Sequence, residues 1–137
     1  MTVRVIAPGP LTTVQDLGRW GHQAWGIPVS GAMDTWSHRA ANQLVGNLPE
    51  AATLEITLAG PKLEFSEDAT VAVVGARFWL EIDGRKIPSG GTFSLSAGGR
   101  LAFGPRTAGA RAYLAVAGGF ERPTVFGSRS TDLASRF

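Results

Sequence analysis

Apolar and polar residues alternate in short runs along most of the chain, a pattern typical of β-strands with one buried face. The strictest alternation is in Thr53–Leu58 (TLEITL), whereas the continuous apolar run Thr70–Val74 suits a strand buried on both faces. Asp83-Gly84 stands between two strand-like runs and predicts a tight two-residue hairpin. Strands are expected at residues 3–7, 11–14, 53–58, 62–65, 70–74, 77–82, 85–87, 92–95, 100–103 and 111–117. Short strands at this spacing, joined by turns, predict a mainly β fold that closes as an antiparallel barrel.

One prominent helix is predicted over residues 34–45. Its apolar residues fall on one stripe at helical spacing, and its polar residues fall on another face, beside the preceding loop. Asp34 or Ser30 can cap its start, and Gly46 stands where a left-handed residue would end it. The apolar stripe comprises Trp36, Ala40, Ala41, Leu44 and Val45, and the polar face comprises Asp34, His38 and Asn42.

A long glycine-rich segment, residues 15–34, precedes this helix and has no apolar periodicity. Loops of this length inside small domains are usually functional or disordered. Trp20 and Trp25 favour an ordered loop, because large apolar rings gain free energy when they are buried. We therefore expect this segment to build a site.

The composition narrows the possible functions. A chain of 137 residues fits a single domain, 1–137, whose last residues, 121–137, are expected to form a loop-like tail. The absence of cysteine removes disulfides and cysteine nucleophiles, and it suits a reducing cytoplasm. The 13 basic and 11 acidic residues are interspersed, so nucleic-acid binding is not indicated. The sequence has neither a signal-peptide pattern nor an apolar run long enough to cross a bilayer, so we expect a cytoplasmic protein with no membrane partner.

Several strings of residues carry a family resemblance over nearly the whole chain. They are TTVQDLGRWG (12–21), GIPVSGAMD (26–34), RAANQLVGN (39–47), LEITLAGPKLEF (54–65), RAYLAVAGGF (111–120) and GSRSTDL (127–133). In this order they resemble the family of the C subunit of bacterial 5-oxoprolinase, also known as KipA or allophanate hydrolase subunit 2, and the biotin-dependent carboxyltransferase part of urea amidolyase. Members of the family look like two related β-rich halves, and this chain resembles the N-terminal half only.

The resemblance implies a cyclophilin-like β-barrel that works with two partners, a KipI-like subunit and a LamB/YcsF-like subunit. Together the three subunits of 5-oxoprolinase use ATP to open 5-oxo-L-proline to L-glutamate. In urea amidolyase the equivalent region transfers a carboxyl group from carboxybiotin to urea. A third possibility is a non-catalytic KipA-like module that binds a KipI-like kinase inhibitor. The sequence has no P-loop and no biotin-carrier motif, so we expect ATP, or biotin, on a partner subunit and no cofactor on this chain.

Three polar residues stand where the first strands open into the loop: Gln15, Asp16 and Arg19. A carboxylate beside a guanidinium could hold a lactam or urea by complementary hydrogen bonds, and Gln15 offers both a donor and an acceptor. We predict that Asp16 and Arg19 are catalytic and that Gln15 binds substrate. The alternative is that Asp16 and Arg19 only pair with each other to fix the loop.

Ser30, Gly31 and Asp34 immediately precede the helix. Amides at a helix start attract anions, and a turn of small residues lets a ligand approach the backbone. Such a site would help where an amide carbonyl gains negative charge. We predict that Asp34 is catalytic and that Ser30 and Gly31 bind substrate, with helix capping alone as the alternative. A serine nucleophile is not indicated, because no G-x-S-x-G turn is present.

Tyr113, on the last expected strand, could point into the barrel mouth and orient a substrate carbonyl. The alternative is a core tyrosine whose hydroxyl is satisfied locally. His22 and His38 are the only histidines. Asp34 and His38 have the spacing of a helical metal-ligand pair, but one such pair is a weak signal. We favour a solvated His38 and predict no metal site.

Overall fold

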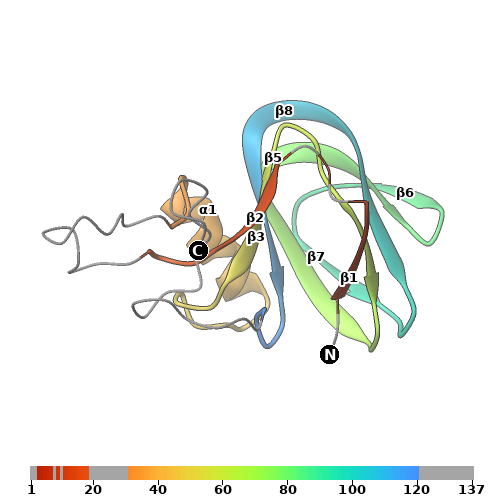
Figure 1. The fold of residues 1–137 in the computed structure, drawn as a ribbon, viewed down its shortest axis with the longest axis horizontal. Helices are drawn as coiled ribbons and strands as arrows, with labels where there is room; N and C mark the ends of the chain where they lie inside the picture. The colour runs from red at the N-terminus through yellow and green to blue at the C-terminus, as the bar shows by residue number, and fades with distance from the viewer. Residues whose placement is uncertain (1–2, 8, 10, 19–30, 121–137) are drawn as a thin grey trace, which may run out of the picture.

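A computed structural model describes residues 3–7, 9, 11–18 and 31–120 of the chain. In this part of the chain eight strands form one sheet, and the helix α1 lies against it (Figure 1). The elements are β1 (Val3–Ala7), β2 (Thr12–Gln15), α1 (Thr35–Leu44), β3 (Thr53–Thr57), β4 (Lys62–Phe65), β5 (Ala69–Ile82), β6 (Arg85–Pro88), β7 (Thr92–Leu95) and β8 (Arg100–Val116). The expected tail, 121–137, lies outside the described residues.

The two long strands β5 and β8 form the centre of the sheet. They pair with each other over most of their length, and β8 also pairs with β4 near its start and with β3 near its end. The outer pairs are β1 with β4, β2 with β3, and β5 with both β6 and β7, and every pair is antiparallel. No pairing joins β1 or β2 to β6 or β7 in the described ranges. The mainly β, antiparallel prediction is therefore confirmed, but the sheet is a curled half-barrel where a closed barrel was expected.

Each long strand replaces two of the expected short ones. Strands were expected at 70–74 and 77–82 and at 100–103 and 111–117, yet β5 and β8 run without interruption through the glycines at 75, 104 and 109. At Gly75 the φ angle is +111°, and an added Cβ would lie 2.5 Å from the carbonyl oxygen of Arg111. The pairing register with β8 shifts directly after this residue. Glycine thus lets β5 bend closely against β8 without ending, as expected of a β-bulge.

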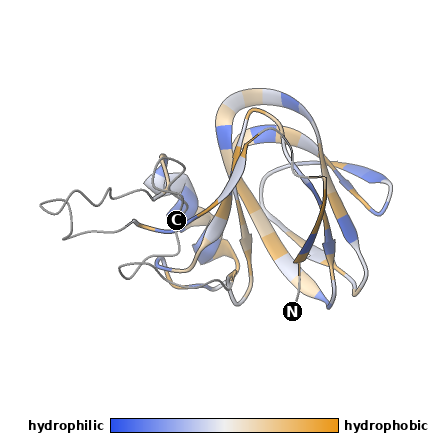
Figure 2. Ribbon diagram, viewed as in Figure 1, coloured by the Kyte–Doolittle hydropathy of each residue, from blue (hydrophilic) through white to orange (hydrophobic). Residues whose placement is uncertain are grey.

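The main hydrophobic core lies inside the curl of the sheet. Apolar and polar residues alternate along the strands in Figure 2, so that one face carries the core. The fully or nearly fully buried side chains of this core include Ile56, Leu63, Phe65, Val71, Val73, Phe78, Leu80, Leu101 and Leu114. The opposite face of β3, β8 and β5 is where α1 packs, with a smaller cluster of Ala32, Ala41, Tyr113 and Ala115.

The bounds of α1 agree with the prediction, but its buried face does not. Asp34 is the N-cap, and Gly46 has a φ of +78° just beyond the C-cap. Two residues of the apolar stripe, Trp36 and Leu44, are exposed, being 74% and 50% accessible. The helix buries one stripe residue, Ala41, together with the polar residues Ser37, His38 and Asn42. No helix of the described residues is long and apolar enough to span a bilayer.

The buried polar face of α1 is explained by hydrogen-bond partners around it. His38 Nε2 lies 2.9 Å from the carbonyl oxygen of Pro49, and Nδ1 lies 3.0 Å from Thr53 Oγ1. Because a carbonyl only accepts, Nε2 carries a proton. Burial lowers the pKa of the ring and so favours its neutral form, in which Nδ1 accepts from the Thr53 hydroxyl. Asn42 donates to the carbonyl of Ala51 at 2.8 Å. The interpretation of His38 as a solvated residue is therefore wrong, because these partners satisfy its ring inside the protein.

Candidate functional site

The two described ends of the glycine-rich segment meet beside α1. The amide of Ala32 donates to the carbonyl of Asp16 at 3.0 Å, and the Asp16 carboxylate accepts from the amide of Gly18 at 2.9 Å. Gly31 has a φ of +91°, and an added Cβ would lie 2.9 Å from the backbone nitrogen of Gly18. Gly31 is therefore required for the close approach of two backbone segments, which is a different use from the predicted contact with a ligand.

A buried carboxyl–phenol pair on the sheet holds the turn before α1. Glu55 on β3 and Tyr113 on β8 are direct cross-strand neighbours, and the Tyr113 hydroxyl donates to Glu55 Oε2 at 2.6 Å. Glu55 Oε2 also accepts from the amide of Met33, and the Tyr113 oxygen accepts from the amide of Asp34, each at 2.9 Å. Two consecutive backbone amides are thus fixed by two side chains of the sheet.

The structure places Tyr113 beneath α1. Its side chain is fully buried on the face that α1 covers, so it does not point into the mouth of the curl. Burial, followed by the hydrogen bond to Glu55, raises the pKa of its phenol well above the ordinary value, so the hydroxyl stays protonated. The alternative of a locally satisfied hydroxyl is the one that the structure shows. Direct binding of substrate by Tyr113 stays a prediction.

Asp34 combines helix capping with an exposed position. Its Oδ1 accepts from the amide of Ser37 at 3.0 Å, and its Oδ2 accepts from the Ser37 hydroxyl at 2.6 Å. The hydrogen bonds from Ser37 lower the pKa of the Asp34 carboxyl below its ordinary value, so it is ionised near neutral pH. Each carboxylate oxygen can accept more than one hydrogen bond, so capping leaves room for a ligand.

Two open cavities of the described structure meet at Asp34. One, of about 740 Å³, lies between α1 and β5 and is lined by Trp36, Leu44 and Arg77 among others. The other, of about 520 Å³, lies beside Met33, Arg77 and Arg111. Asp34 and Arg77 line both cavities. A ligand could therefore reach the Asp34 carboxylate from either side.

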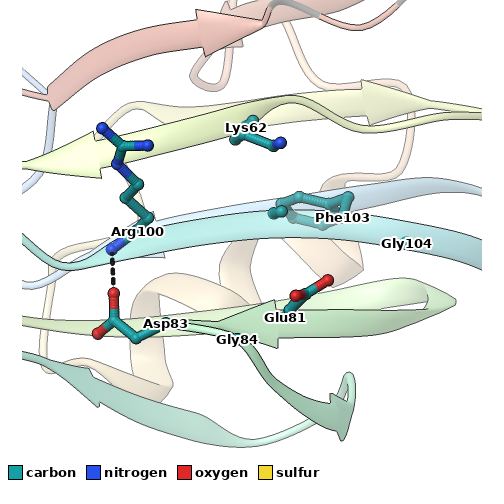
Figure 3. A pocket seen from close by; sticks show the side chains of 8 residues that line it. Lys62, Glu81, Asp83, Gly84, Arg100, Phe103 and Gly104 are labelled. Carbon is teal, nitrogen blue, oxygen red and sulfur yellow. Dashed lines mark hydrogen bonds between the residues drawn. The ribbon is translucent and has the colours of Figure 1, made fainter.

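A third cavity, of about 470 Å³, lies on the outer surface of β4, β5 and β8 (Figure 3). Charged side chains of both signs surround it, and the amide of Arg100 donates to Asp83 Oδ1 at 2.9 Å. The Arg100 guanidinium also pairs with Glu64 at 3.0 Å. None of the residues predicted for the site lines this cavity, so we place the candidate site at Asp34.

The structure contains no group of three or more potential metal ligands among the residues it describes. Both ring nitrogens of His38 are engaged by Thr53 and Pro49, so His38 cannot join Asp34 in a metal pair without losing these bonds. His22 lies outside the described residues.

Of the predicted site residues, five are described and lie in one connected region: Gln15, Asp16, Gly31, Asp34 and Tyr113. Gln15 is buried at the end of β2, where its side-chain amide donates to Thr13 Oγ1 at 3.0 Å. Arg19 and Ser30 lie outside the described residues, so their predicted roles remain predictions, and so does the Asp16–Arg19 pair. The roles of the five described residues in binding or chemistry also remain predictions.

Three residues at the site were missed in the sequence: Glu55, Arg77 and Arg111. The alternation of TLEITL puts Glu55 on the polar face of its strand, and in the structure α1 and the turn before it cover that face. The signal for this site is that Glu55 lies directly opposite Tyr113 on the neighbouring strand. It could not be seen in the sequence, because it depends on the register in which the two strands pair.

Comparison with known proteins defines the class to which this arrangement belongs. The family described as carboxyltransferase domain, subdomain A and B, matches residues 25–137. The chain therefore belongs to this family, as the resemblance of its motifs predicted.

Individual relatives are similar over nearly the whole chain. The sequence is 44% identical to the C subunit of 5-oxoprolinase from Escherichia coli (strain K12) over 131 residues, which cover 96% of this chain and 42% of that protein. It is 41% identical to urea amidolyase of Lachancea kluyveri, covering 93% of this chain and 7% of the relative. The crystal structure of TTHA0988 superposes with a TM-score of 0.92 at 40% identity, covering 98% of this chain and 51% of that one. The chain thus spans about half, or much less, of the proteins it matches.

Proposed function

We propose that this chain is part of an ATP-dependent hydrolase of cyclic amides, of the 5-oxoprolinase type, and that it acts together with a KipI-like and a LamB/YcsF-like subunit. The observation that carries the proposal is the 44% identity to the C subunit of a 5-oxoprolinase across the segments that form the site. The exposed, ionised carboxylate of Asp34, at the junction of two cavities, supports it. ATP would be bound by one of the two partners, because this chain has no phosphate-binding loop.

The contribution of this chain is to position groups before the substrate arrives. Glu55 and Tyr113 fix the amides of Met33 and Asp34, so the turn keeps one conformation. The lowered pKa makes the Asp34 carboxylate a weak base near neutral pH. It is better suited to accept a hydrogen bond from the N–H of a substrate amide and so to orient that amide.

The test uses the three-subunit mixture and the conservative variant Asp34→Asn. Asparagine caps helices about as well as aspartate, so α1 is retained while the charge is removed. We expect ATP-dependent opening of 5-oxo-L-proline to fall by about 10²-fold, the typical loss when one electrostatic group is removed from an active site. Assembly with the two partner subunits on a sizing column should not change. Arg19→Ala is expected to behave in the same way.

The matched control is Glu81→Gln, which removes an exposed charge from β5 outside the two cavities at Asp34. Its turnover should equal that of the wild type. Full turnover by both Asp34→Asn and Arg19→Ala would remove these residues from the chemistry.

A second candidate function is supported by the urea amidolyase relatives. The chain would then be part of a carboxyltransferase that passes a carboxyl group from biotin, held on another chain, to urea. Consumption of urea in the presence of a biotin carboxylase and a biotin carrier, without turnover of 5-oxoproline, would favour it. Binding of the KipI-like subunit without turnover of either substrate would favour the non-catalytic module.

A further inference from the structure

The cavity beside Met33 has an unusual balance of charge. Two of its lining residues are the arginines Arg77 and Arg111, and its one acidic residue is Asp34. Neither guanidinium makes a hydrogen bond or an ion pair with the described residues. Both oxygens of Asp34 are already directed to Ser37. The two arginines outnumber the single carboxylate, so the described lining of the cavity carries a net positive charge.

Arg111 is placed in this cavity by the strand that carries the site. It precedes Tyr113 by two residues on β8, so the two side chains leave the same face of the sheet. Its Nε is buried and has no hydrogen-bond partner in the described structure. A buried donor without a partner costs free energy, and a bound anion or an ordered water at this position would satisfy it.

Arg77 reaches the same cavity from β5. It follows the register shift after Gly75, and irregularities of this kind re-aim side chains next to binding sites. The remaining lining residues are mostly small, namely Gly75, Ala76, Ala108, Gly109 and Ala110, so little side-chain bulk stands in the cavity beside the two arginines. Two arginines flanking one open volume can hold a carboxylate by parallel N–H···O bonds.

We propose that Arg77 and Arg111 bind a carboxylate group of the substrate, and hence that this site takes a carboxylate-bearing cyclic amide and not neutral urea. This inference rests on the proposed function, which it makes more specific. Asp34, at the edge of the same cavity, would then accept the amide N–H while the arginines hold the acid group. The carboxylate would fix the position of the ring.

The experiment measures binding and turnover separately in the assembled complex. The probes for titration calorimetry are 5-oxo-L-proline, 2-pyrrolidinone, which is the same lactam without a carboxylate, and urea. Binding of 5-oxo-L-proline should be at least tenfold tighter than binding of 2-pyrrolidinone or urea. Arg77→Gln and Arg111→Gln should each raise the dissociation constant for 5-oxo-L-proline about tenfold or more, because each removes one charge-assisted contact. Binding of 2-pyrrolidinone should change less than twofold.

Two further variants guard the interpretation. Arg85→Gln removes an exposed arginine of β6 that does not line this cavity, and it should leave all three affinities unchanged. Arg111→Lys keeps the charge without the fork of donors and should recover part of the affinity. Since Arg77 is exposed, Arg77→Gln should fold normally even if Arg111→Gln does not.

The outcomes separate the two proposals. Arginine variants that bind 5-oxo-L-proline within twofold of wild type, in a complex that turns it over, would overturn the inference and leave the proposed function standing. Arginine-dependent binding without ATP-dependent turnover would overturn the function and retain the carboxylate site. Equal affinity of the wild type for 5-oxo-L-proline and 2-pyrrolidinone would also overturn the inference.

Discussion

The substitution Tyr113→Phe tests how the sheet holds the turn before α1. It keeps the ring and removes one oxygen that donates to Glu55 and accepts from the amide of Asp34. Each lost bond is worth about 1 kcal/mol, and leaving a buried polar group unsatisfied costs about 1–3 kcal/mol. Because Glu55 is only 8% exposed, water cannot readily replace the phenol. We therefore expect a loss of about 2–4 kcal/mol in the free energy of unfolding.

Urea denaturation of the chain measures this loss as a lower midpoint with an unchanged slope. Thr70→Val is the matched control, because it removes an exposed hydroxyl of β5 that has no hydrogen bond to the described residues, and it should change stability by less than about 0.5 kcal/mol. A double-mutant cycle with Glu55→Gln should give a coupling of about 0.5–3 kcal/mol between the two residues. A loss below about 0.5 kcal/mol for Tyr113→Phe, or additive effects in the cycle, would refute the argument.

Three further predictions concern neighbouring residues. Asp34→Ala should lower the free energy of unfolding in urea by about 0.5–2 kcal/mol, while Asp34→Asn should lower it little. The pKa of the Asp34 carboxyl is lowered in the folded state, so its charge stabilises the protein above about pH 4, and this contribution is lost as the pH falls through the lowered pKa. Asp34→Asn should lack this pH dependence. Gly31→Ala should lower the free energy of unfolding clearly more than Gly46→Ala. Both glycines have a positive φ, but only a Cβ at position 31 would meet backbone atoms, those of Gly18, within 3 Å. Equal losses of stability in the two variants would contradict this reason. Burial lowers the pKa of His38 in the folded protein, so below about pH 6.5 the unfolded chain binds a proton that the folded protein does not. The melting temperature should therefore fall below that pH more steeply in the wild type than in His38→Gln.

Much of the fold could be predicted because it depends on local signals. The hairpin at Asp83-Gly84 is present, with φ of +48° and +85° at its two residues, as the type I′ turn requires. The helix begins after Asp34 and ends before Gly46, because a cap and a left-handed glycine act within one turn. These features need no knowledge of distant residues.

The errors come from tertiary context. The periodicity of α1 shows an apolar stripe, but the surroundings of the helix offer the Thr53 hydroxyl and the carbonyls of Pro49 and Ala51 to its polar side chains. Hydrogen-bond partners therefore decided the orientation of the helix over apolar periodicity. Glu55, Arg77 and Arg111 could not be assigned to the site because their proximity depends on strand register and on the bend at Gly75. The position of Asp34 at the start of α1 could be predicted, because an N-cap residue directly precedes its helix in the sequence.

The most direct measurement is the rate at which the KipI-like and LamB/YcsF-like subunits open 5-oxo-L-proline with ATP, with this chain present, omitted or replaced by Asp34→Asn. We expect turnover that requires the chain and falls by about 10²-fold in the variant. Equal rates with and without the chain, or full activity of Asp34→Asn, would show that the fixed turn at the start of α1 has no part in the reaction.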